Sequence, residues 1–218
     1  MSEGRKIRAA LFDFDGVIAD TEGQYSLFWN RMGQEYLGVD GLHVHIKGQT
    51  LTHILGTYFP GRPALWSEIE DRVNRFEEQM SFDYIAGIET FAADLRRAGV
   101  SMCIVTSSNH MKMSSALRVH PDLERTFGPI LTSEDFSRSK PDPDCFLVGM
   151  KRLGASPHET VIFEDSINGL RAAMASGATV IGLATTNSRD DIAPLCHKVI
   201  DDFRGLNYQS INQLRNNN

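Results

Sequence analysis

The sequence predicts an α/β protein, with a doubly wound, Rossmann-like parallel sheet and a small α-helical domain inserted after the first strand. Short apolar runs typical of buried strands alternate with helical patterns from residue 87 to residue 200. Gly99, Gly154 and Gly177 stand where three of these helices should end. Between the first apolar run and this alternating part, the periodicity is only helical. Strands that alternate with helices form parallel sheets whose two faces are both covered.

Length and composition fit this fold and exclude several classes of protein. The 218 residues, 41% hydrophobic and 23% charged, allow one domain with a modest insertion. The net charge of −6 disfavours nucleic acid or an anionic membrane as a partner. No apolar run approaches a membrane span or a signal segment. Three scattered cysteines, Cys103, Cys145 and Cys196, favour thiols in a reducing compartment. We therefore expect a cytoplasmic protein, and a monomer is compatible with the sequence.

The first strand is predicted at Ala9–Phe12, and the helical insertion follows it. Its first helix ends near Gly38, its second covers residues 50–58, and its third covers residues 63–80. We predict a cap domain over residues 20–84 and a core domain over residues 1–19 and 85–218. The first helix carries an apolar stripe, for which packing is the favoured interpretation, at Tyr25, Phe28, Trp29, Met32 and Tyr36.

The rest of the chain supplies the alternating strands and helices of the core. In parallel sheets of this kind, ligands bind beyond the carboxyl ends of the strands. Polar signatures that follow these strands are therefore candidates for a common site. The predicted strands cover residues 100–105, 130–131, 161–163, 179–183 and 199–200, and the predicted helices cover residues 89–98, 114–119, 143–153 and 166–176.

Two carboxylates, those of Asp13 and Asp15, follow the first strand, and Gly16 permits a sharp turn after them. Each carboxylate raises the free energy needed to ionise the other. A divalent cation would offset that repulsion and leave one carboxylate free to attack an electrophile. Asp-x-Asp-Gly at a strand end is thus the arrangement expected of metal-assisted phosphoryl transfer. The alternative is a solvated turn after an edge strand.

Two further signatures carry groups that suit a phosphate. The hydroxyl of Thr106 and the backbone N–H groups of Ser107 and Ser108 could donate to phosphate oxygens. Taken alone, such residues more often form a helix N-cap. Lys140 lies between Ser139 and Pro141, on a loop that its prolines stiffen. It would neutralise phosphoryl charge and position a nucleophile, although a lone loop lysine is usually a solvated charge.

A second acidic strand end lies at Glu164 and Asp165. It could bind a cation together with Asp13, and it could equally complement the dipole of the helix that follows. Ser166 is expected to cap that helix, and Asn168 is expected to contact the loop that contains Lys140.

These four signatures, in this order, resemble those of the haloacid dehalogenase superfamily, in the branch whose helical cap follows the first loop. The resemblance covers about residues 8–203. It implies a Rossmann-like core with an inserted cap. Phosphatases and β-phosphoglucomutases belong to that branch. The signatures read DFDGVIADTE at residues 13–22, VTSSN at residues 105–109, SKPDP at residues 139–143 and IFEDS at residues 162–166.

The resemblance implies phosphoryl chemistry. Asp13 would attack phosphorus and form an aspartyl-phosphate, and Asp15 would act as general acid and base. In the dehalogenases the position that matches Asp15 is not acidic, so Asp15 favours phosphoryl over carbon–halogen chemistry. The implied cofactor is Mg²⁺, which prefers oxygen ligands. Its ligands would be Asp13, Asp165 and the backbone carbonyl of Asp15, with Glu164 as a more distant or water-mediated partner.

In the insertion, residues 46–50 resemble the substrate-specificity loop of the cap. Lys47 could reach into the closed site, and Gly48 could allow close approach of the backbone. As solvated loop residues they need no such role, and both interpretations stay open.

The predicted function is Mg²⁺-dependent hydrolysis of a small phosphorylated metabolite, a sugar phosphate being favoured. One alternative is a β-phosphoglucomutase-like phosphosugar mutase. That family has His, Arg and Lys where this chain has Tyr25, Leu51 and Asn109, with Arg72 or Arg75 as candidate substitutes. A second alternative is a catalytically silent protein that binds a phosphometabolite. The complete set of core signatures argues against it.

Overall fold

In residues 6–216, the part of the chain that the computed structural model describes, six strands form one parallel sheet. The predicted doubly wound α/β fold is confirmed. The strand order is β3-β2-β1-β4-β5-β6, so the first strand lies at the centre of the sheet. The strands are β1 (Ala9–Phe12), β2 (Ser101–Val105), β3 (Ile130–Leu131), β4 (Thr160–Glu164), β5 (Thr179–Leu183) and β6 (Lys198–Ile200).

Strand β1 is buried along its whole length, because it has a strand on each side and helices pack on both of its faces. Phe12, its last residue, is in register with Ile104 of β2 and Phe163 of β4. The chain places β2 and β3 on one side of β1 and then crosses to place β4, β5 and β6 on the other side. The strand order therefore reverses between β1 and β4. In open α/β sheets, the carboxyl ends of the strands at such a reversal frame the ligand crevice.

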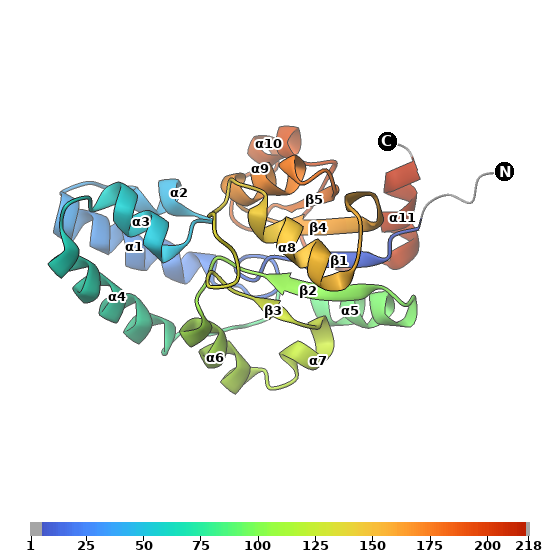
Figure 1. The fold of residues 1–218 in the computed structure, drawn as a ribbon, viewed down its shortest axis with the longest axis horizontal. Helices are drawn as coiled ribbons and strands as arrows, with labels where there is room; N and C mark the ends of the chain where they lie inside the picture. The colour runs from blue at the N-terminus through green and yellow to red at the C-terminus, as the bar shows by residue number, and fades with distance from the viewer. Residues whose placement is uncertain (1–5, 217–218) are drawn as a thin grey trace.

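Helices cover both faces of this sheet, as Figure 1 shows. Leu11 of β1 faces the layer of α8, α9 and α10, whereas Phe12 faces the layer of α5, α6, α7 and α11. Successive strand residues point to opposite faces, and both are apolar, as a fully covered parallel sheet requires. The helices are α5 (Ile88–Arg97), α6 (His110–Val119), α7 (Leu123–Phe127), α8 (Asp144–Leu153), α9 (Ile167–Ala175), α10 (Arg189–Ile192) and α11 (Tyr208–Asn216), with 3-10 turns at Pro157–Glu159 and Ala193–Leu195.

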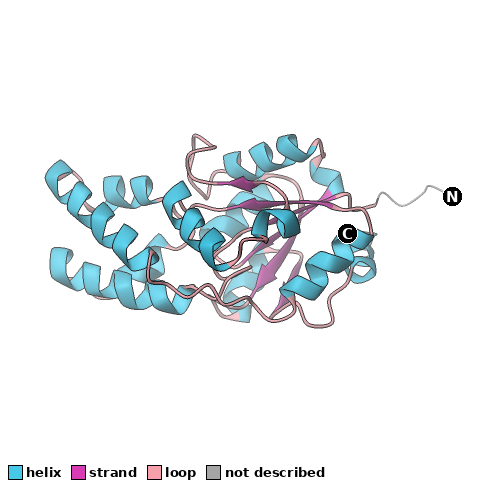
Figure 2. Ribbon diagram, turned by 90° about the horizontal axis from the view of Figure 1, so that it is seen from below, coloured by secondary structure: helices cyan, strands magenta, loops and turns pink. Residues whose placement is uncertain are grey.

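The insertion after β1 consists of four helices with a hydrophobic cluster of their own. Trp29, Ile54 and Ile69 are among the residues of that cluster. Figures 1 and 2 both place these helices beyond one end of the sheet. We call them the cap helices: α1 (Glu22–Leu37), α2 (Leu42–Ile46), α3 (Leu51–Tyr58) and α4 (Pro63–Glu77).

The chain enters and leaves the cap helices through two segments that lie side by side. The backbone N–H of Asp20 donates to the carbonyl of Asp83 at 2.8 Å, and that of Ile85 donates to the carbonyl of Ile18 at 2.9 Å. The chain thus enters and leaves the cap helices at one point beside the sheet.

Several predicted elements differ at their ends. The helix expected at residues 114–119 begins at His110, because the side chain of Asn109 accepts the backbone N–H of Lys112 at 2.9 Å and so caps it. The helix expected to reach residue 80 ends at Glu77. Four helices were not predicted, namely α2, α7, α10 and α11, the first three of which have five residues or fewer. Within residues 6–216, no helix has both the length and the apolar character that crossing a membrane requires.

Candidate active site

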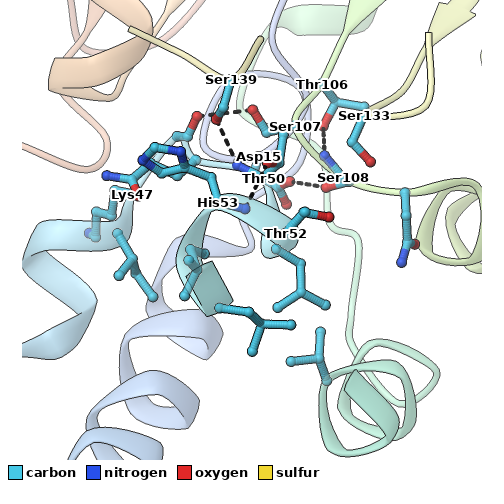
Figure 3. A pocket seen from close by; sticks show the side chains of 18 of the residues that line it. Asp15, Lys47, Thr50, Thr52, His53, Thr106, Ser107, Ser108, Ser133 and Ser139 are labelled. Carbon is cyan, nitrogen blue, oxygen red and sulfur yellow. Dashed lines mark hydrogen bonds between the residues drawn. The ribbon is translucent and has the colours of Figure 1, made fainter. Parts of the chain in front are cut away.

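The carboxyl ends of the strands and the cap helices enclose a cavity of 870 Å³. Figure 3 shows Asp15 beside Ser107 and Ser108, with Thr50 and His53 on the side of the cap helices. Eight of the predicted site residues line this cavity together, namely Asp13, Asp15, Lys47, Gly48, Thr106, Ser107, Ser108 and Asp165. The remaining two, Lys140 and Glu164, lie behind Asp13 and contact it or each other.

Asp13 extends from the end of β1 and is held by a buried lysine. The Nζ of Lys140 donates to Asp13 Oδ1 at 2.6 Å and to Glu164 Oε1 at 2.7 Å. Burial raises the pKa of Asp13 to about 7, against the opposing charge of Lys140. Burial also works against the charged form of Lys140, but the carboxylates of Asp13 and Glu164 outweigh it and raise the pKa of the ammonium. Lys140 is therefore a permanent cation beside the candidate nucleophile.

Three buried carboxylates meet at the reversal point of the sheet. Asp13, Glu164 and Asp165 each offer one oxygen, and these oxygens lie within 4.8 Å of one another. Burial, reinforced by the charge of Glu164, raises the pKa of Asp165 well above its usual range. Of these three carboxylates, Lys140 pairs with Asp13 and Glu164 only, so a cation among them would lower the free energy of their ionised forms. A set of donors made only of oxygen atoms fits Mg²⁺.

Glu164 occupies both of its oxygens within the protein. Oε1 accepts from Lys140, and Oε2 accepts from the backbone N–H of Ser166 at 2.7 Å and from its hydroxyl at 3.1 Å. Gly169 packs so closely on this carboxylate that a Cβ there would overlap Oε1. Ser166 caps α9, as expected, by accepting the backbone N–H of Gly169. Glu164 is therefore fixed beside Lys140, with less freedom to bind a metal than Asp165.

The carboxylate of Asp15 lies apart from this group of three. Its Oδ1 accepts from the hydroxyl of Thr21 at 2.5 Å and from the Nζ of Lys112. Its Oδ2 accepts from the hydroxyl of Ser108 at 3.0 Å. The side chain of Asp15 thus faces cationic and hydroxyl donors, and only its backbone carbonyl is left for the predicted metal role.

Lys112 is the functional candidate that sequence reasoning missed. It lies on α6, is fully buried, and forms an ion pair with Asp15 across 97 positions of the chain. Its Nζ also lies 4.5 Å from the centroid of the Tyr25 ring. A signal was present, because Lys112 shares the buried face of α6 with Met113 and Ala116. A lysine at a position that faces the core requires a buried partner.

The predicted phosphate loop is present, with some of its donors already engaged. The hydroxyl of Ser107 donates to the carbonyl of Gly48 at 2.9 Å, and that of Ser108 donates to Asp15. The backbone N–H of Ser108, predicted as a donor to phosphate, donates to Thr106 Oγ1 at 3.1 Å. The backbone N–H of Ser107 makes no hydrogen bond to any described residue. It remains, with the hydroxyl of Thr106, as a donor for an anion.

The loop at Lys47 and Gly48 contacts the sheet side of the cavity through its backbone. The carbonyl of Lys47 accepts from the side chain of Asn168 at 3.0 Å. This hydrogen bond joins Asn168 to the cap loop, whereas the predicted partner was the loop that contains Lys140. Gly48 has a φ of +76°, and a Cβ there would clash with the hydroxyl of Ser166. The Nζ of Lys47 itself lies 3.2 Å from the carboxylate of Glu22. Lys47 thus lines the cavity as part of an ion pair.

Comparisons with known proteins agree with this geometry. A family model described as haloacid dehalogenase-like hydrolase matches residues 10–183. The chain is 28% identical over 185 residues to a phosphorylated carbohydrates phosphatase of Thermotoga maritima, a match that covers 78% of this chain and 82% of the relative. It is 26% identical over 184 residues to hexitol phosphatase A of Escherichia coli (strain K12), a match that covers 82% of this chain and 83% of the relative.

The fold also matches solved structures along nearly its whole length. A β-phosphoglucomutase from Clostridium difficile superimposes with a TM-score of 0.80 at 19% identity. The match covers 97% of this chain and 98% of that chain. At this identity the likeness shows the fold alone.

Proposed function

The chain belongs to the haloacid dehalogenase-like hydrolase family, and from that membership we propose that it is a Mg²⁺-dependent phosphatase of a small phosphorylated metabolite, above all a sugar phosphate. Family membership and the phosphatases among its relatives make it a phosphoric monoester hydrolase. The finer proposal rests on one observation, which is that two neighbouring aspartates have different partners. Asp13 is paired with buried Lys140, and Asp15, two residues later, is held separately by Thr21 and Lys112.

In the proposed mechanism, the carboxylate of Asp13 attacks phosphorus and forms an aspartyl-phosphate. Lys140 holds Asp13 in place and neutralises charge that develops on the transferring group. Asp15 donates a proton to the leaving oxygen, and it later accepts one from the water that hydrolyses the aspartyl-phosphate. Mg²⁺, held by Asp13, Asp165 and the backbone carbonyl of Asp15, would supply neutralisation of phosphoryl charge when bound.

The phosphoryl group itself is proposed to lie against the loop after β2. The hydroxyl of Thr106 and the backbone N–H of Ser107 are the donors that remain for it, and Lys140 adds positive charge. Ser107 and Ser108 support this site indirectly through the contacts of their hydroxyls with Gly48 and Asp15.

The cap helices are proposed to exclude water and select the leaving group. Ser107 and Asn168 hold the loop at Lys47 and Gly48, and Ser139 accepts the backbone N–H of Thr50 at 3.1 Å. Because these contacts hold the loop over the cavity, they would keep bulk water from the substrate while its phosphoryl group is transferred to Asp13. We propose the domain division on the same basis, with the cap at residues 20–84 and the core at residues 1–19 and 85–218. Residues 1–5 and 217–218 of that core lie outside the described part.

The mutase alternative receives less support. Tyr25, Leu51 and Asn109, the three departures from the β-phosphoglucomutase pattern, all line the cavity. Arg72, one candidate substitute for the missing cation, instead pairs with Glu35 at 2.7 Å, and neither it nor Arg75 is among the residues that line the cavity. A mutase must hold a sugar that already carries a phosphate, and these positions supply no cation for it.

The remaining expectations also stay proposals. The three free cysteines support the proposed location in the reducing cytoplasm. The relatives named as phosphatases of carbohydrates and hexitols support a small metabolite as the partner.

A phosphate-release assay tests the function. We expect the protein to release phosphate from p-nitrophenyl phosphate and from members of a panel of sugar phosphates, and to do so only with Mg²⁺. Absence of release from every ester, with the fold intact, would favour the binding protein. Conversion of β-glucose 1-phosphate to glucose 6-phosphate faster than phosphate release would favour the mutase.

A further inference from the structure

The ammonium of Lys112 is a buried charge that the proposed mechanism does not yet use. It is fully buried, and its Nζ contacts Asp15 Oδ1 and lies 3.1 Å from the hydroxyl of Ser108. A buried ammonium is stable only if it is paired and hydrogen-bonded. Asp15 is the one carboxylate with which Lys112 forms an ion pair within residues 6–216. The position of Lys112 and that of Asp15 therefore depend on each other.

The cap helices close the other side of this ammonium. The ring of Tyr25 lies 4.5 Å from Nζ, at a distance that permits a cation–π interaction. The hydroxyl of Tyr25, on α1, donates to Glu77 Oε1 of α4 at 2.5 Å, so the ring is itself fixed. With Tyr25 on one side and Asp15 on the other, Lys112 has no route to solvent.

The donors around Asp15 are distributed unequally over its two oxygens. Oδ1 accepts from both Thr21 and Lys112, whereas Oδ2 accepts only from the hydroxyl of Ser108. Each oxygen of a carboxylate accepts about two hydrogen bonds. Oδ1 is thus saturated, and Oδ2 has one position left. That position is the one available to a proton or to the oxygen of a substrate.

We propose that Lys112 is a positioning residue that, with Thr21, engages Oδ1 of Asp15 and so makes Oδ2 the atom that exchanges protons with the substrate. The inference rests on the proposed phosphatase function. As the Asp13 oxygen forms its bond to phosphorus, the bond from phosphorus to the leaving oxygen breaks, and its electron pair stays on that oxygen. The proton on Asp15 Oδ2 moves to the leaving oxygen. In the second step, the oxygen of a water molecule bonds to phosphorus, and the bond from phosphorus to the Asp13 oxygen breaks with its electron pair left on that carboxylate. Oδ2 takes a proton from the attacking water.

The test compares two esters of similar size that differ in their need for a proton. Phenyl phosphate releases a poorer leaving group than p-nitrophenyl phosphate, so it depends more on the general acid. We expect Lys112→Met to lower kcat/KM for phenyl phosphate about tenfold or more, and to lower kcat/KM for p-nitrophenyl phosphate several-fold less. The value of kcat/KM is used because it reports the steps up to the formation of the phosphoenzyme. Lys151→Met, which removes an exposed lysine from α8, should change neither value.

Two more variants separate positioning from a structural role. Lys112→Met should have little further effect in an Asp15→Asn background, because residues that act as a unit are not additive. If Lys112→Met does not fold, Thr21→Val, which removes the other donor to Oδ1, should show the same dependence on the leaving group. Equal losses on the two esters, or additive losses with Asp15→Asn, would overturn the inference. If the parent protein released phosphate with Mg²⁺ from neither of these esters nor from any sugar phosphate of the panel, the proposed function would fail and not merely the role of Lys112.

Discussion

At the scale of single residues, the site concentrates negative charge in a buried position. Burial raises the pKa of Asp13 to about 7, so the proposed nucleophile, which must be ionised to attack, also readily holds a proton. Lys140 stabilises the ionised form, and a divalent cation beside Asp13 and Asp165 would do so further. The residues of this site therefore favour chemistry that begins with a bound cation.

Asp13→Asn should abolish phosphate release while the protein stays folded. An amide cannot form the aspartyl-phosphate, whereas it keeps the size of the side chain and can still accept from Lys140. Circular dichroism checks the fold, and intact mass measured after the assay checks that the amide has not hydrolysed. Substantial release of phosphate by an Asp13→Asn variant of verified mass would contradict the assignment of Asp13 as nucleophile.

Mg²⁺ should raise the Tm of the metal-free protein, and more at about pH 8 than at about pH 5.5. A carboxyl whose pKa is raised from 3.8 to about 7 on folding binds more protons in the folded state than in the unfolded state. Its contribution to stability is thus present at low pH and is lost as the pH rises through about 7. Mg²⁺ must displace those protons at the lower pH, and it finds the carboxylates ionised at the higher pH.

The size of this effect follows from mass action. At a Mg²⁺ concentration about a hundredfold above Kd, the gain in stability is about 2.7 kcal/mol. Differential scanning fluorimetry measures it without any turnover. Asp165→Asn should lose most of the gain, and an equal gain in that variant would show that Asp165 is not a ligand.

The sequence identified the candidate residues that come directly after strands, because they belong to motifs. It could not identify the contacts between these residues. Asp13, Asp15 and Asp165 are candidates because both strands end in acids, and the resemblance of the motifs to a known family gave them their roles. Lys112 is part of no motif, and its partner lies 97 positions earlier in the chain. Only the tertiary arrangement places α6 beside the loop after β1 and so shows that the two charges meet.

At the scale of elements, the loop between α2 and α3 joins the cap helices to the sheet side of the cavity. Gly48 has a φ of +76° and lies against Ser166, so an alanine there combines backbone strain with a clash. Gly61, in the turn before α4, has a φ of +69°, but a Cβ there would meet no atom within 4 Å. Alanine variants at the two positions therefore separate the effect of backbone strain from the effect of the contact with Ser166.

Gly48→Ala should lower kcat/KM for the preferred sugar phosphate at least about tenfold, because the loop can no longer close on Ser166. Gly61→Ala should leave kcat/KM nearly unchanged. Both variants should lose a comparable amount of stability, about 1–2 kcal/mol, from the left-handed backbone. Steady-state kinetics and thermal unfolding measure the two quantities, and equal kinetic losses would mean that the Gly48 contact has no role in closure.

The ends of elements were predictable where a cap or a turn residue marks them. Gly38 and Gly154 end α1 and α8 at the expected places because both adopt the left-handed conformation. Helices α2, α7 and α10 were missed because two or fewer turns carry too little periodicity to distinguish them from loops.

At the scale of the whole molecule, a cluster of aromatic rings packs the C-terminal part of the chain against the sheet. Phe203 is buried, and the centroid of its ring lies 5.4 Å from that of Phe91 and 5.5 Å from that of Phe163. Phe203→Ala should lower the free energy of unfolding by about 3–5 kcal/mol through lost burial and the cavity that it leaves. Urea unfolding should show a lower midpoint with an unchanged m-value. Leu27→Ala, at a side chain that is 77% exposed, should change the midpoint little, and a similar shift in both would refute the cluster's importance.

The fold class followed from the alternation of strands and helices, but the order of strands did not. Each strand is an apolar run, and the residues around Phe12 do not indicate that β2 and β4 are the two neighbours of β1. That order results from the crossover connections and the packing of helices on both faces. It decides the site, because it brings Asp13 next to Asp165.

The side-by-side segments at Asp20 and Asp83 give the cap helices the character of an exchangeable cassette. The two ends of the insertion already lie side by side, so a change in its length displaces no strand. The entropy cost of closing the chain between these ends grows only slowly with that length. On the proposed role of the cap helices, exchange of one contiguous piece of the gene changes the substrate range and leaves Asp13 and Asp165 in place. The exchange carries one condition. Thr21 and Tyr25 travel with the cassette, so each new insert must bring its own donor to Asp15 and its own cover for Lys112.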